Sequence, residues 1–189
     1  MTTKEIQTYS QNTKKQADLI LKKTQLVESL SRFGTVHLIG SYAMDVMYNP
    51  DIGIIVTSKD IRASSLKALE VILQKRICQK IEYGDFVKFK RAKRPAGYII
   101  VLKIISKGVL WEVEIWFLSS AQKEKKFMEK MLKQLTPEKK KLILEFKHLI
   151  NQNHISKHQI SSSDIYNAIL DKNIASFTAL LQQFPNVKK

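Results

Sequence analysis

Two neighbouring stretches, VHLIGSYAMD (residues 36–45) and NPDIGIIV (residues 49–56), decide the fold of this 189-residue chain. The first is an apolar run that ends in Gly40 and Ser41, and the second opens on Asp51 and continues as an apolar run. This order predicts a buried strand, a turn into a short helix, and then a second strand. Gly40 allows the backbone to turn tightly and to approach a ligand. Ser41, with the free amides at the start of the new helix, predicts a phosphate-binding site.

Apolar periodicity predicts the elements on either side of these two strands. Spacings of mostly three, four or seven residues indicate amphipathic helices, and short apolar or alternating runs between turn residues indicate strands. The expected elements are helices over residues 4–32, 58–75 and 121–135, and strands over residues 80–91, 97–106 and 110–118.

This order of elements predicts an α/β fold in which helices flank a small mixed sheet. Everything after Ser119 has helical periodicity. We therefore expect an α/β domain over residues 1–118 and a helical C-terminal region over residues 119–189 that packs on it. The last helices are equally suited to docking a protein partner.

The composition indicates a polyanionic partner and a reducing compartment. The chain has 32 Lys and Arg residues against 17 Asp and Glu, a formal net charge of +15, which favours contacts with phosphate groups. The single cysteine, Cys78, cannot form an internal disulfide. No apolar run approaches the length of a membrane span, and the N-terminus lacks the apolar core of a secretory signal. We expect a cytoplasmic protein without membrane contact.

A second group of acidic residues lies on the last predicted strand, in the segment WEVEIW (residues 111–116). Glu112 and Glu114 are two residues apart, so their side chains share one face of a strand. Asp51 opens an earlier strand.

These motifs resemble the nucleotidyltransferase superfamily, whose fold is that of DNA polymerase β. In that superfamily, Gly-Ser is followed after about ten residues by Asp-x-Asp, and many small bacterial members carry a third carboxylate in a Trp-x-x-Asp-Ile-Trp-like context. Gly40, Ser41, Asp51 and Glu114 match this pattern in order. The resemblance implies transfer of a nucleoside monophosphate from an NTP to an acceptor that the sequence does not identify.

The resemblance also implies a metal site. Two Mg²⁺ (or Mn²⁺) ions about 3.5–4 Å apart would activate the attacking group and neutralise the triphosphate. Asp51 and Glu114 would be catalytic, Asp51, Glu112 and Glu114 would be the metal ligands, and Gly40 and Ser41 would bind the nucleotide. The sequence departs from the pattern at Gly53, which stands where the second Asp of Asp-x-Asp belongs. Weakened metal binding and impaired activity follow as expectations.

A basic segment, KFKRAKR (residues 88–94), falls at the predicted hairpin between the strands over residues 80–91 and 97–106. Lys88, Lys90 and Arg91 are candidates for holding the triphosphate or the backbone of RNA or DNA. The alternative is a charged edge hairpin that resists aggregation.

Three functions stay open at this point. The first is metal-dependent nucleotidyl transfer, and the second is nucleotide or nucleic-acid binding by a catalytically inactive member of the superfamily. The third is docking of another protein chain, as in antitoxin-like proteins of this fold.

Overall fold

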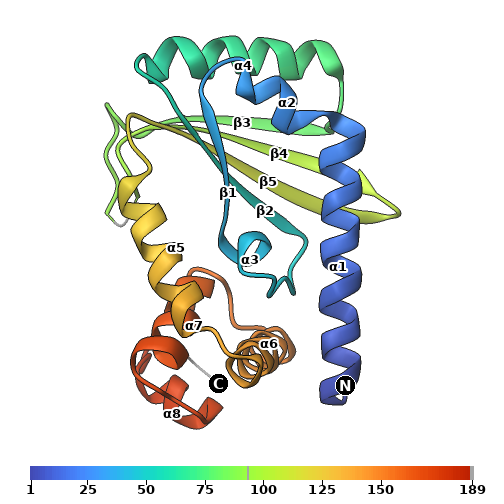
Figure 1. Ribbon diagram of the computed structural model, residues 1–189, viewed down its shortest axis with the longest axis vertical. Helices are drawn as coiled ribbons and strands as arrows, with labels where there is room; N and C mark the ends of the chain where they lie inside the picture. Colours follow the sequence, from blue (N-terminus) through green and yellow to red (C-terminus); the bar gives the residue numbers. More distant parts are fainter. Residues whose placement is uncertain (93, 188–189) are drawn as a thin grey trace.

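The computed structural model describes residues 1–92 and 94–187, and it contains a five-stranded mixed sheet (Figure 1). The strand order is β1-β2-β5-β4-β3. The central pair, β2 and β5, is parallel, and each of the other neighbouring pairs is antiparallel. The strands are β1 (Thr35–Ile39), β2 (Asp51–Thr57), β3 (Lys80–Asp85), β4 (Tyr98–Ser106) and β5 (Val109–Leu118).

One face of the sheet is covered by α1 (Thr3–Thr24), α2 (Leu26–Ser31) and α4 (Ile61–Lys75). The main core lies between these helices and the alternate, apolar side chains of the strands, such as Ile54 and Ile115, both fully buried. Alternation along β2 and β5 therefore leaves the acidic side chains on the opposite face.

The helix predicted over residues 4–32 is two helices in the structure. Gln25 adopts a left-handed conformation (φ 48°), closing α1 and starting α2. No glycine or proline marks this break in the sequence, so periodicity alone carries one helix through it.

The strand predicted over residues 80–91 ends at Asp85. The Asp85 carboxylate accepts hydrogen bonds from the backbone amides of Val87 and Lys88, both at 2.9 Å, and this turn takes the chain away from β4. Lys88, Lys90 and Arg91 therefore lie in a loop, and the prediction that the strand continues to residue 91 is wrong.

The C-terminal region forms a second core with the N-terminal part of α1. Ile6 of α1, and Met44 and Val46 from the chain after β1, pack with the apolar side chains of this region. Its elements are α5 (Gln122–Gln134), α6 (Pro137–Gln152), α7 (Ser162–Tyr166), the π-helical turn η1 (Asn167–Asp171) and α8 (Phe177–Gln182).

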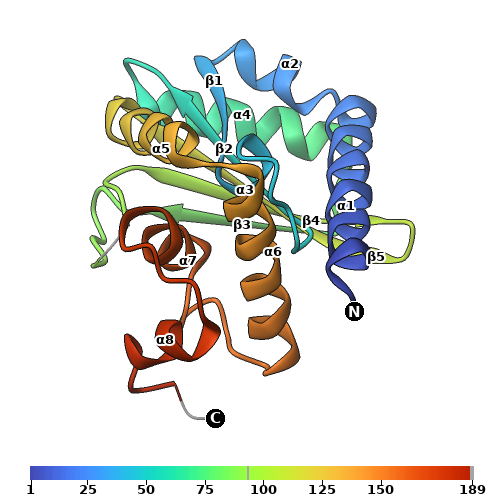
Figure 2. The ribbon, with the colours of Figure 1, turned by 60° about the horizontal axis from the view of Figure 1, so that its bottom comes forward.

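Most apolar side chains of the last helices lie in the second core, where Phe177 and Leu181 are partly buried. Ile165, Tyr166, Ile169 and Leu170 are all at least 97% buried in the second core. Figures 1 and 2 both place α8 and α4 at opposite ends of the molecule. Within the described residues, every helix is too short or too polar to cross a bilayer.

Candidate functional site

Strand register brings the predicted carboxylates together on the face of the sheet opposite α4. Asp51 of β2 pairs with Glu112 of β5, and Gly53 pairs with Glu114. Because paired residues of neighbouring strands project to the same side, Asp51, Glu112 and Glu114 share this face. Gly53, the fourth residue of these two pairs, has no side chain to add to the group. A Cβ atom there would lie 3.0 Å from Cγ1 of Ile39, so that side chain must shift to admit a larger residue.

Basic side chains from three parts of the chain neutralise these carboxylates. Lys103, which pairs with Glu112 across β4 and β5, donates a hydrogen bond to its Oε2 atom. Lys157, between α6 and α7, donates to the Oε1 atom of Glu112, and its Nζ lies 3.8 Å from Oε1 of Glu114. Arg94 lies 3.9 Å from the other oxygen of Glu114.

The three carboxyl groups differ in their tendency to ionise. Burial raises the pKa of Asp51, and the nearby Lys147 and Lys157 only partly counteract it. Burial also acts to raise the pKa of Glu112, but hydrogen bonds from Lys103 and Lys157 outweigh it and lower that pKa to about 2. The pKa of Glu114 is raised, mainly by burial. Glu112 is therefore the carboxylate that holds the lysines as ion pairs.

This arrangement does not fit a pair of Mg²⁺ ions. Gly53 provides no ligand, and both oxygens of Glu112 already accept hydrogen bonds from lysines. Mg²⁺ needs free oxygen ligands in near-octahedral geometry. Across residues 1–92 and 94–187, no three or more His, Cys, Asp or Glu side chains form a group suited to a metal ion.

The predicted phosphate site at Gly40 and Ser41 faces the C-terminal region. Gly40 opens α3 (Gly40–Ala43) with φ 67°, the conformation that its lack of a side chain allows. The Ser41 hydroxyl accepts a hydrogen bond from Nζ of Lys147 at 2.7 Å and lies 2.9 Å from the Tyr166 hydroxyl. Lys147 also donates to the Val46 carbonyl at 2.8 Å and to the Tyr166 hydroxyl at 3.0 Å. Ser41 is thus part of a buried polar network.

Sequence reasoning missed Lys147 and Lys157. Lys147 is only 3% exposed, and it occupies the buried stripe of α6 between Ile143 and Ile150. Residues three or four apart lie on one face of a helix, so the spacing of Lys147 from Ile143 and Ile150 already indicates that Lys147 lies on the buried face of α6. Lys157 lies in an irregular segment, where the sequence gives no comparable signal.

A cleft of ≈ 420 Å³ is lined by Glu112 and Glu114, by a third acidic residue, Glu82, and by basic and aromatic side chains. Phe86 and Trp116 lie with ring centroids 5.4 Å apart. The Arg91 guanidinium lies 5.5 Å from the Phe86 ring centroid, and that of Arg94 lies 5.9 Å from the Trp116 ring centroid. Lys157 lines the same cleft.

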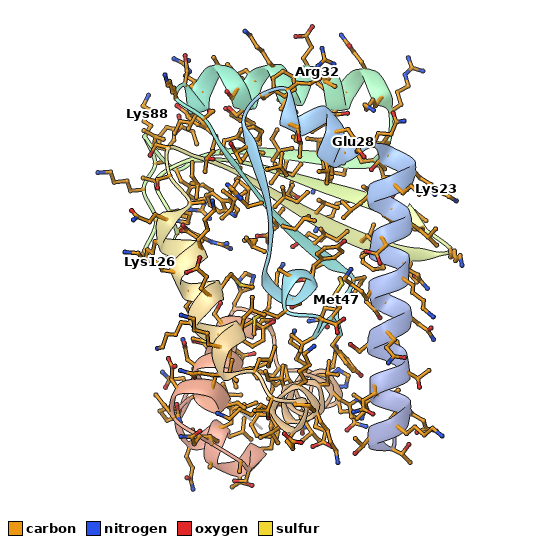
Figure 3. The ribbon with its side chains drawn as sticks, in the orientation of Figure 1. Lys23, Glu28, Arg32, Met47, Lys88 and Lys126 are labelled. Carbon is orange, nitrogen blue, oxygen red and sulfur yellow. The ribbon has the colours of Figure 1, made fainter. Side chains whose placement is uncertain are left out.

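The predicted basic segment is thus divided in two. The side chains of Lys88, Lys90, Arg91 and Arg94 are all exposed, but only those of Arg91 and Arg94 line the cleft. Figure 3 places Lys88 and Lys126 of α5 on the side of the molecule away from α1. Lys93, the remaining cation of the segment, lies outside the described residues.

The similarity of this chain to known proteins lies in its fold. No protein-family model matches the chain, and neither does any curated protein. Solved structures do match. A MgATP-bound Cid1 poly(U) polymerase superposes with a TM-score of 0.63 at 16% identity over 91% of this chain. The polymerase core of TRAMP, an RNA surveillance complex, superposes with 0.56 at 18% identity over 89%. The non-canonical poly(A) polymerase complex GLD-2–GLD-3 superposes with 0.55 at 13% identity over 98%.

These matches cover 55%, 56% and 64% of the three polymerase chains, so this chain corresponds to little more than half of each. At such identities the likeness concerns the fold. The chain therefore has the nucleotidyltransferase fold.

Proposed function

We propose that this chain binds single-stranded RNA in the cleft beside its carboxylates and does not carry out metal-dependent nucleotidyl transfer. The observation that carries the proposal is the meeting of two guanidinium groups and two aromatic rings in one cleft, next to carboxylates that lysines already neutralise. Binding of this kind needs no divalent metal.

The chemistry of the cleft suits a single strand. Arg91 and Arg94 supply positive charge for phosphate groups, and their guanidinium groups lie near Phe86 and Trp116. The half-buried Phe86 is the ring available for stacking, because Trp116 is only 6% exposed. Unpaired bases stack on aromatic rings without regard to sequence, while cations follow the backbone. The formal net charge of +15 strengthens the attraction for any polyanion. RNA is favoured over DNA because the solved structures that share the fold are described as RNA terminal U-transferase, RNA surveillance and poly(A) polymerase proteins.

A second candidate is the activity that the resemblance implies: transfer of a nucleoside monophosphate from an NTP with Mg²⁺ or Mn²⁺. The observation in its favour is that Asp51, Glu112 and Glu114 lie on one face in adjacent register. It requires the lysines to leave Glu112 and the ions to bind without a ligand from Gly53. A solved relative of the fold holds MgATP, which makes this candidate worth testing directly.

Fluorescence anisotropy with a labelled single-stranded RNA, in a salt series with and without EDTA, tests the binding proposal. We expect binding that EDTA leaves unchanged and that weakens steeply as salt rises. Arg94→Gln should lower the affinity and reduce the slope of log affinity against log salt by about 1. Arg32→Gln is the matched control because Figure 3 places Arg32 beside α4, on the other side of the sheet. The proposal is refuted if the RNA affinity changes neither with salt nor in Arg94→Gln. Equal affinity for single-stranded DNA would show that the cleft binds polyanions in general.

An extension assay tests the second candidate. The same RNA is incubated with each NTP and Mg²⁺ or Mn²⁺, and its 3′ end is followed on a gel. We expect no added nucleotides from the unaltered chain. Extension that Asp51→Asn abolishes would establish transfer and contradict the proposed loss of activity.

A further inference from the structure

Lys157 is presented to the carboxylates by a short segment that is held at both ends. The Ile155 amide donates to the Ile150 carbonyl at 3.0 Å, and the Ile160 amide donates to the Ser156 carbonyl at 3.1 Å. Ile160 is 98% buried in the C-terminal core. Ser156 adds hydrogen bonds from its amide and hydroxyl to the Gln159 side chain, both at 3.0 Å. The position of Lys157 is therefore set by its neighbours.

The ammonium group of Lys157 lies against the two glutamates of β5 and acts electrostatically on Asp51 of β2. It donates to Glu112 and lies 3.8 Å from Glu114, and it lines a second small cleft together with Asp51. The other nearby cations are attached elsewhere: Lys103 on β4 and Arg94 before it. Lys147 also acts on Asp51, so four cationic side chains surround the three carboxyl groups and more than offset their formal charge without any bound ion.

We propose that Lys157 is a built-in cation: its ammonium takes the place of a divalent ion among Asp51, Glu112 and Glu114, and it ties residues 153–161 to the sheet. The inference rests on the proposed function, because a protein that binds RNA without metal chemistry still needs these carboxylates neutralised beside a polyanion. Lys157 neutralises them permanently, with no dependence on metal concentration.

Two physical effects favour Lys157 over a free divalent ion at this position. A side chain held by its own backbone stays at high effective concentration near its acceptors, so a free ion competes poorly with it. A divalent ion that entered beside Lys157 would also meet a like charge a few ångströms away. Even in a water-like dielectric, removing one such charge favours a divalent ion by on the order of tenfold or more.

The direct test measures Mn²⁺ binding by calorimetry and by the electron paramagnetic resonance signal of free Mn²⁺. Lys157→Met should gain a Mn²⁺ site at least about tenfold tighter than any in the unaltered chain. The gain should disappear in Lys157→Met/Glu112→Gln. Lys130→Met is the matched control, since Lys130 forms an exposed ion pair with Asp171 on another surface. Equal Mn²⁺ affinity in the unaltered chain and in Lys157→Met would overturn the proposal.

A measurement on the unaltered chain keeps the proposal testable even where Lys157→Met folds poorly. Hydrogen–deuterium exchange of residues 153–161 should be the same with EDTA and with Mg²⁺, because Lys157 and no metal holds the segment. Slower exchange in Mg²⁺ would overturn the proposal. RNA binding of the unaltered chain in EDTA decides the proposed function separately, so failure of one idea is distinguishable from failure of the other.

Discussion

Replacing Glu112 by Gln should lower the free energy of unfolding by about 1–2 kcal/mol at pH 7, whereas the same change at Glu114 should leave it unchanged or raise it. The two side chains lie two residues apart on one strand face and have the same chemistry. Their environments differ: Glu112 accepts hydrogen bonds from Lys103 and Lys157, and burial dominates at Glu114.

The magnitude follows from the pKa of Glu112. A carboxyl group whose pKa falls from 4.5 to about 2 on folding contributes at most about 3 kcal/mol at neutral pH. Water still reaches the pair, since the Glu112 side chain is 20% exposed and that of Lys157 is 59% exposed. Screening reduces the contribution to about 1–2 kcal/mol. Neither lysine is left as a deeply buried charge in Glu112→Gln, so no larger penalty is expected.

The pH dependence has opposite signs at the two positions. The pKa of Glu112 is lower in the folded state, so its contribution is complete above pH 4.5 and is lost as the pH falls towards about 2. The pKa of Glu114 is raised, so ionisation above its unfolded pKa opposes folding. Glutamine removes that opposition.

Urea unfolding followed by the fluorescence of Trp111 and Trp116 measures both variants. The deficit of Glu112→Gln relative to the unaltered chain should shrink to about half at pH 3. The reasoning fails if Glu112→Gln and Glu114→Gln shift stability by the same amount in the same direction. It also fails if the deficit of Glu112→Gln is the same at pH 3 and pH 7.

Three further changes test other parts of the structure. Phe86→Leu keeps an apolar side chain but removes a stacking surface, so RNA affinity measured by anisotropy should fall by about 1 kcal/mol or more, and equal affinity would exclude stacking on this ring. Trp111→Phe should change the unfolding free energy by less than about 1.5 kcal/mol. The lost packing is offset because the change also removes a buried indole N–H that has no hydrogen-bond partner among the described residues. A larger loss of stability in urea unfolding would contradict this. Gly34→Ala should cost about 2–3 kcal/mol, because its Cβ would lie 2.3 Å from the Thr57 carbonyl oxygen, and a neutral thermal-melt result would disprove that close approach.

Local patterns predicted the strands and the shared face of Glu112 and Glu114, and the resemblance carried by Gly40, Ser41, Asp51 and Glu114 predicted the fold. Apolar runs identified all five strands, and the two-residue period of a strand placed Glu112 and Glu114 together. The Gly40-Ser41 turn and Asp51 followed from order along the chain. These features depend on residues close in sequence, where steric and hydrophobic rules act directly.

The contacts that decide the chemistry of the site could not be predicted in the same way. Lys157 reaches Glu112 across 45 residues of sequence, and Lys147 reaches Ser41 across 106. Only the fold brings such pairs together, and a Lys-rich chain offers many equivalent candidates. The basic segment shows the same limit, because the chain turns at Asp85 and only Arg91 and Arg94 line the cleft, while Lys88 and Lys90 lie outside it.

The charge balance at the site links Gly53 to Lys157. An aspartate at position 53 would stand beside Glu114, whose pKa burial already raises, and it would add a negative charge that needs a further cation. In a metal-dependent enzyme that cation is a divalent ion. With glycine at this position, Lys103, Lys157 and Arg94 pair with Glu112 and Glu114, and Lys147 and Lys157 act on Asp51. The missing aspartate and the added lysine therefore work in the same direction, and restoring the aspartate alone would leave Lys157 competing for the place of the metal.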